Sequence, residues 1–195
     1  MALSEVLVDE LRDMYSAENQ LVKALPKLAQ GAINKELKSL FTQHLDETKG
    51  QVDRLKQVFE ILGEKPTGEH CNGMEGVIEE GADALEKDED GASFDSGLVG
   101  AALRTEHYEI AGYTATIEMA KVLGLSDVAG LLTENLNEEL TAAKKILGAA
   151  QSILKESASE PTAEKQPKTG KEKYSDQKSK EDEKKAAPDL KRRVS

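Results

Sequence analysis

Four long segments of this chain carry apolar residues at intervals of three and four, the spacing that gathers side chains on one face of an α-helix. These segments span about residues 3–30, 35–62, 94–123 and 126–155, and residues 74–87 repeat the pattern over a shorter length. Aromatic residues make up 4% of the chain, and β-branched residues never cluster into alternating runs. The sequence therefore predicts an all-α protein.

Turn-forming residues separate the predicted helices. Gly31 with Asn34 divides the first pair of long helices, and Gly124 with Ser126 divides the second pair. Two short connections predict two antiparallel hairpins, and about thirty residues between them are long enough to travel the length of a bundle. This pattern predicts a four-helix bundle with one long crossover that carries the short extra helix. Pro26 is expected to kink the first helix or to end its regular part early.

Carboxylates interrupt the apolar stripes of these helices near their middles. Glu109 shares its stripe with small residues, and a carboxylate there requires a binding partner. Glu18 and Glu47 lie 29 residues apart across the first turn, and Glu109 and Glu138 repeat this interval across the second. Each is about fifteen residues from its turn, or roughly 22 Å at the helical rise. The four carboxylates are therefore expected to meet near the middle of the bundle.

Four ionised carboxylates in an apolar interior repel one another and each loses several kcal/mol in desolvation, so a pair of cations is predicted between them. His44 lies one turn from Glu47, and Glu106 lies one turn from Glu109. Oxygen-rich ligation with few imidazoles suits iron or manganese better than zinc or copper. The predicted cofactor is two Fe (or Mn) ions, held by Glu18, His44, Glu47, Glu106, Glu109 and Glu138.

Plainer interpretations stand beside these assignments. A glutamate on a helical stripe often lies at its edge with its head in water, and His44 can be a hydrogen-bonded core residue. His107 lies roughly 100° around the helix from Glu106 and is expected to face away from the metals. His70 and Cys71 are adjacent on a loop and are not expected to bind a metal. Four further side chains can hydrogen-bond ligand carboxylates or simply pack: Tyr15, Gln51, Tyr108 and Tyr113.

Composition limits the partners and the location. A formal net charge of −11 argues against nucleic acid or an anionic membrane surface as a partner. A single cysteine fits a reducing compartment, and no 18-residue apolar stretch occurs, so a cytoplasmic protein is predicted. Residues 1–155 are predicted to form the bundle. Residues 156–195 are predicted to be a disordered tail that keeps the protein soluble. The alternative is that the basic residues 191–193 make an electrostatic contact with a partner.

Several stretches resemble the YciE/YciF-type ferritin-like stress proteins of bacteria, over about residues 3–155. They are DMYSAENQLVKALPKLA, FTQHLDETKGQVDRLKQVFEILG, RTEHYEIAGY and NLNEEL. Ferritin-like di-iron proteins place single glutamates on two helices and Glu-x-x-His on the other two. Glu18 and Glu109 match the single glutamates, and Glu47 and Glu138 match the motif glutamates. Positions 50 and 141 are glycine and threonine where the motif has histidine, and His44 instead precedes its glutamate.

The resemblance implies a homodimer linked to stress responses, with ferroxidase activity. Together with the carboxylates, it predicts a cytosolic di-metal protein that oxidises Fe(II) with dioxygen or peroxide. The metal centre itself is the expected catalytic group. Two alternatives remain open: a non-catalytic dimeric scaffold with a structural or relic metal site, and manganese-dependent peroxide disproportionation.

Overall fold

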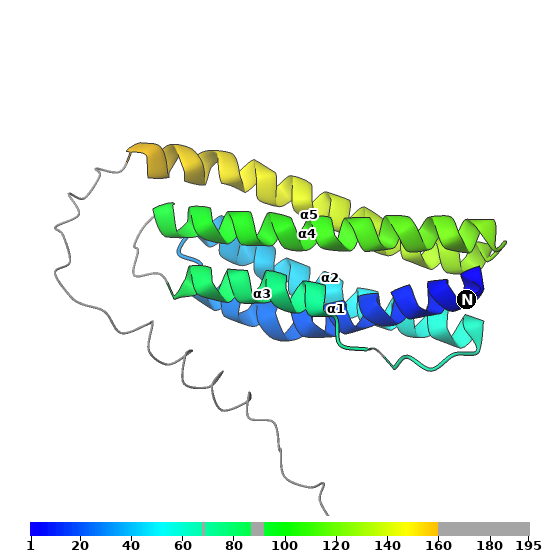
Figure 1. Cartoon of the computed structure of the whole chain (residues 1–195). Coiled ribbons are helices and arrows are strands. Elements are labelled where there is room, and N and C mark those ends of the chain that lie inside the picture. Colours follow the sequence, from blue (N-terminus) through cyan, green and yellow to red (C-terminus); the bar gives the residue numbers. More distant parts are fainter. Residues whose placement is uncertain (68, 87–91, 160–195) are drawn as a thin grey trace, which may run out of the picture. The chain divides into compact units, whose positions relative to one another are not determined.

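Five helices make up the computed structural model, which describes residues 1–67, 69–86 and 92–159 (Figure 1). They are α1 (Leu3–Gly31), α2 (Lys35–Leu62), α3 (Asn72–Leu85), α4 (Ala92–Val122) and α5 (Ser126–Ser159). None of the described residues lies in a strand. The all-α prediction is confirmed. Helix α5 runs four residues past its predicted end, and the rest of the predicted tail lies outside the described residues.

The helices are arranged as two hairpins that pack side by side (Figure 1). Helix α1 packs against α2 and α4, and α5 packs against α4 and α2, which completes a bundle of four helices. The crossover brings α3 along the outside of this bundle, where it packs against α1 and α4. The predicted ferritin-like four-helix bundle with a helix in its long crossover is therefore confirmed.

The turns between paired helices have specific stabilising contacts. The Asn34 side chain accepts hydrogen bonds from the backbone of Glu36 at 2.9 Å and of Leu37 at 3.1 Å, as expected of an N-cap. The buried Asp95 carboxylate of α4 accepts two backbone N–H bonds from Ile33 and Asn34. Asp95 thus ties the α1–α2 turn to the second hairpin, a contact the sequence analysis did not anticipate.

Pro26 lies inside α1, and the helix continues through it to Gly31. The alternative of an early end is therefore wrong, although proline removes one backbone hydrogen bond, and the alternative of a kink stays a prediction. Its neighbour Leu25 is buried in the core, and packing of this kind can compensate for the lost bond.

The apolar interior consists of two clusters, one toward each end of the bundle. Leu21, Leu37, Phe41, Leu98 and Ile153 belong to the cluster that includes residues of α3. The other cluster includes Leu11, Leu55, Phe59, Ile117 and Leu132. On α2, α4 and α5, polar residues lie between the residues of one cluster and those of the other. None of the described helices is long and apolar enough to cross a membrane.

Gly73, near the start of α3, lies against the ring of Tyr108, and we expect Gly73→Ala to destabilise the fold. A Cβ there would lie 2.6 Å from the Tyr108 hydroxyl, which Asp13 and Cys71 hold by hydrogen bonds of 3.1 and 3.0 Å. Overpacking of this kind costs about 1–3 kcal/mol. Thermal melting should show a lower Tm. Gly76→Ala is the control, because its Cβ meets nothing within 4 Å and alanine favours helix, so that Tm should not fall.

Candidate metal centre

Five buried polar side chains meet between the two apolar clusters and are called here the central group: Glu18 of α1, His44 of α2, Glu106 and Glu109 of α4, and Glu139 of α5. Each is at most 3% exposed. One ligand-type atom from each of the last four lies within 4.8 Å of the others. Glu18 is close enough for the charges of Glu139 and Glu109 to act on it. The central group therefore combines side chains from all four long helices.

His44 supplies the nitrogen atoms of the central group. Its Nε2 atom lies 3.4 Å from a Glu106 oxygen and 3.8 Å from a Glu139 oxygen. Its Nδ1 atom lies 3.5 Å from Glu47 Oε2, on the outer side of the group. Neither nitrogen has a hydrogen-bond partner within the described part of the chain. The imidazole thus lies between a half-buried carboxylate and two buried ones.

Several acceptor atoms of the central group have no hydrogen-bond partner among the described residues. They are one oxygen each of Glu18, Glu106 and Glu139, and both oxygens of Glu109. A buried polar atom without a partner costs free energy, and a buried charge costs more. Unpartnered oxygens that face one another, with an imidazole among them, match the donor set of iron or manganese. The residues present therefore fit a metal ion.

The raised pKa values of the central group also indicate a site suited to cations. Burial raises the pKa of Glu18, Glu106 and Glu109 well above the ordinary carboxyl value, and the charge of Glu139 raises each pKa further. Without a cation, ionising these carboxyls places like charges in a medium that screens them weakly. Divalent cations would reverse this cost, because each carboxylate then faces a positive charge.

Helix α5 contributes Glu139 to the central group and not Glu138, the residue that the sequence analysis selected. Glu138 is turned toward the surface, with its side chain 32% exposed, and pairs with Arg54. The interval counted across a turn places a residue only to within about one position, and one position is 100° of rotation about a helix. A buried carboxylate was expected at position 138 of α5, and the structure has it at position 139.

Glu47 also lies outside the central group, at its edge. Its side chain is 24% exposed, accepts a 2.8 Å hydrogen bond from Gln43 and lies 3.6 Å from Lys145. The contact with His44 is the main reason that the pKa of Glu47 is lowered. Glu47 therefore contacts the imidazole from the side opposite to Glu106.

Neighbouring polar residues hold two carboxylates of the central group. Gln51 donates to Glu139, and the buried Tyr113 hydroxyl donates to Glu18, so both residues make contacts that the sequence analysis considered. Tyr15 instead packs edge-on against Phe59, and Tyr108 donates to Asp13. Asn135, on the buried face of α5, donates to the Tyr113 hydroxyl at 2.9 Å.

The histidines outside the central group have other surroundings. His107 is exposed, and its Nδ1 atom lies 2.8 Å from the Leu103 carbonyl oxygen. His70 pairs with Glu75 at 3.0 Å, and both side chains are about half exposed. Neither contributes to the central group.

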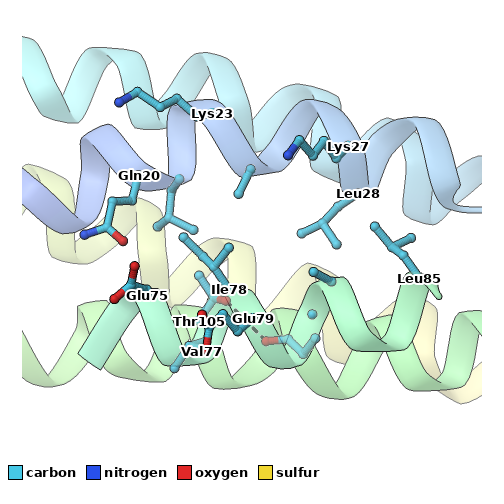
Figure 2. Close-up of a pocket in the computed structure, with 15 residues that line it drawn as sticks. Gln20, Lys23, Lys27, Leu28, Glu75, Val77, Ile78, Glu79, Leu85 and Thr105 are labelled. Carbon is cyan, nitrogen blue, oxygen red and sulfur yellow. Dashed lines mark hydrogen bonds between the residues drawn. The ribbon is translucent and has the colours of Figure 1, made fainter. Parts of the chain in front are cut away.

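A separate groove of about 320 Å³ lies between α1, α3 and α4 (Figure 2). Its lining is mostly apolar, with Leu28 and Ile78 on facing helices. The charged side chains at its rim, among them Lys23 and Glu79, are exposed. The groove shares no residue with the central group and has no buried ionisable side chain in its lining. The groove therefore offers no buried titratable group to a ligand.

An antiparallel four-helix bundle with buried carboxylates and one imidazole at its centre defines a ferritin-like helical protein with a candidate metal site. The chain belongs to the family described as a domain of unknown function, DUF892, which matches residues 2–159. The YciE/YciF-type resemblance drawn from the sequence is confirmed.

Relatives with names and solved structures support this membership. The chain is 42% identical to protein YciF of Escherichia coli strain K12 over 138 residues, covering 70% of this chain and 83% of that protein. The crystal structure of the E. coli stress protein YciF superposes with a TM-score of 0.77 at 38% identity, covering 80% of this chain and 98% of that one. YcfI from Rhodopseudomonas palustris gives a TM-score of 0.73 at 42% identity, covering 75% and 94%.

Proposed function

We propose that the central group binds two Fe (or Mn) ions and that the protein oxidises Fe(II), with dioxygen or peroxide as the electron acceptor. The observation that carries the proposal is the set of unpartnered, fully buried carboxylate oxygens around His44. A bundle selected only for stability would fill these positions with apolar side chains, because buried unpaired charges are costly. A cation pair accounts for their presence on three of the long helices, around His44 of the fourth.

The proposed ligands are Glu18, His44, Glu106, Glu109 and Glu139. Ferritin-like bundles hold two metal ions with four glutamates and two histidines from four helices. The central group supplies four glutamates and one histidine from four helices, so it comes close to that set with one imidazole fewer. Glu139 replaces Glu138 in the set proposed from sequence. We assign Glu47 to orienting His44, because a metal-bound histidine commonly places its second nitrogen against a carboxylate.

The redox step consumes Fe(II) as substrate. Two Fe(II) ions each lose one electron, and dioxygen takes up these two electrons and two protons to give hydrogen peroxide. With peroxide as the acceptor, two electrons and two protons give two water molecules. The buried carboxylates favour the ferric product, because negative ligands stabilise the higher charge. Their burial also separates the reacting ions from bulk water.

Stopped-flow oxidation of Fe(II) tests the activity. The metal-free protein is mixed with about two Fe(II) per chain in air-saturated buffer or with peroxide, and ferric absorbance is followed. We expect oxidation faster than in protein-free buffer. We expect Glu139→Gln to lose this difference because it removes a negatively charged ligand. A wild-type rate equal to that of protein-free buffer would contradict ferroxidase activity.

A non-catalytic helical protein with a structural metal site is the second candidate. The complete burial of the central group favours it, and the hollow beside Glu47 has a volume of only about 10 Å³. In that case metal binding would raise Tm without any faster oxidation of Fe(II). The stopped-flow measurement therefore separates the two candidates.

The predicted homodimer and cytoplasmic location remain predictions. Helix α5 exposes Leu140, Leu147 and Leu154 by 49%, 56% and 52%, at seven-residue intervals along one side. Such a row is suited to packing against another helix. Sedimentation velocity of the purified chain measures the oligomeric state directly.

A further inference from the structure

A continuous hydrogen-bonded chain leads from the surface of the bundle into the central group. Arg54 of α2 donates to Glu138 and, through Nε, to the amide oxygen of Asn135. The amide nitrogen of Asn135 donates to the Tyr113 hydroxyl at 2.9 Å, and that hydroxyl donates to Glu18 Oε1. These contacts join side chains from all four long helices and end on one oxygen of a proposed metal ligand.

Arg54, at the surface end of these hydrogen bonds, fixes which group donates in each of them. Arginine can only donate, so the atom of Asn135 that faces Arg54 must be the amide oxygen. The amide nitrogen is then left to face Tyr113, and it can only donate. Because its oxygen accepts from Asn135, the Tyr113 hydroxyl directs its single proton to Glu18. Reversing the amide would place two donors, Arg54 and the amide nitrogen, against each other.

These hydrogen bonds make the two carboxylate oxygens of Glu18 different. Oε1 is held by Tyr113, whereas Oε2 is buried and has no partner among the described residues. Tyr113 and Asn135 are both 0% exposed, so water does not compete for these bonds at their surfaces. One oxygen of the carboxylate is thus fixed, and the other is left for a ligand.

We propose that Arg54, Asn135 and Tyr113 are positioning residues that fix which oxygen of Glu18 faces the metal pair. The inference rests on the proposed metal centre. It also gives a role to Glu138, which anchors the guanidinium at the surface. Gly50 leaves space for this guanidinium, since even an added Cβ there would lie 3.7 Å from Arg54 Nη1.

Titration with Co(II) tests the proposal, with the dissociation constant and the visible ligand-field spectrum as readouts. Tyr113→Phe removes only the hydroxyl, and we expect about tenfold weaker binding of at least one ion with an altered spectrum. Arg54→Met frees the Asn135 amide to turn its oxygen toward Tyr113, and a similar change is expected. The control is Tyr108→Phe on the same helix, whose hydroxyl bonds to Asp13 and not to the central group.

The double variant distinguishes positioning from general weakening of the fold. Because Arg54 is proposed to act through Tyr113, Arg54→Met combined with Tyr113→Phe should bind Co(II) no more weakly than Tyr113→Phe alone. Additive losses, or wild-type affinity and spectrum in both single variants, would overturn the positioning role. A wild-type chain that binds no Co(II) would instead overturn the metal centre, and the positioning role with it.

Discussion

Replacing Glu139 by glutamine is expected to reduce bound Fe or Mn from about two ions per chain to one or fewer. The Glu139 carboxylate is 0% exposed, lies 3.8 Å from His44 Nε2, and acts electrostatically on every other glutamate of the central group. Glutamine keeps the size and the oxygen that accepts from Gln51, but it removes the charge that would bind the ions. The fold should therefore survive while the metal is lost, as elemental analysis and circular dichroism can show.

Glu138→Gln is the matched control, one residue away on the same helix. Its side chain is partly exposed and pairs with Arg54, and a glutamine oxygen can still accept from the guanidinium. We expect this variant to retain about two ions per chain. Equal metal loss in both variants would contradict the assignment of Glu139, and loss in Glu138→Gln alone would return the ligand role to Glu138.

Glu109→Met is expected to make the metal-free protein more stable than the metal-free wild type. Both carboxylate oxygens of Glu109 are buried without a partner among the described residues. Replacing buried charged groups by apolar side chains of similar volume commonly stabilises a fold by about 1–4 kcal/mol. For a chain of this length, each kcal/mol corresponds to roughly 2–4 °C in Tm. Such a gain would identify Glu109 as a residue kept for function at the expense of stability.

The size of this gain depends on pH. Folding raises the pKa of Glu109 above the ordinary value of 4.5, so the folded state binds more protons than the unfolded state above that pH. The free energy of unfolding of the metal-free wild type therefore falls as pH rises from 4.5 through the raised pKa. Below 4.5 Glu109 is protonated in both states, so this contribution to stability is fully present there.

Urea denaturation of both metal-free proteins measures the effect. The midpoint of Glu109→Met should exceed that of the wild type by more at about pH 8 than at about pH 4.5, because only the wild type has this carboxyl to ionise. Excess Mn(II) at about pH 8 should then raise the wild-type midpoint more than that of the variant. A variant less stable than the metal-free wild type would contradict the interpretation of Glu109 as an unpaired buried carboxyl.

The helices and their pairing were predictable because they depend on local spacing and on short turns. Helix α2 begins and ends where the pattern places it, between the Asn34 cap and Gly63 in a left-handed conformation at φ 69°. Asp95 could not be anticipated, because its bonds to the α1–α2 turn join residues more than sixty positions apart. A buried carboxylate that caps a distant turn leaves no periodic signal on its own helix.

The choice between Glu138 and Glu139 could have been made from sequence. Both residues satisfy three- and four-residue spacing from Asn135, so that spacing alone does not separate them. Seven residues either side of Glu139 lie Leu132 and Ile146, both in the apolar core. Seven residues either side of Glu138 lie Leu131 and Lys145. Because lysine is rarely buried, Lys145 indicates that this face of the helix reaches the surface.

The hydrogen bonds around the central group were only partly predictable. Tyr113 and Gln51 could be suggested because each lies one turn from a glutamate on the same helix. The bonds from Arg54 through Asn135 to Tyr113 cross between helices, and their directions depend on side-chain rotamers and on which group can only donate. The spacing of residues along one helix shows neither which helices come into contact nor which rotamers their side chains adopt.

Elemental analysis of the protein purified without added metal tests the central claim most directly. The central group predicts about two Fe or Mn per chain, lost on treatment with a chelator and restored by adding either metal. Protein that contains neither metal, and binds neither when it is supplied in excess, would contradict the proposed metal centre.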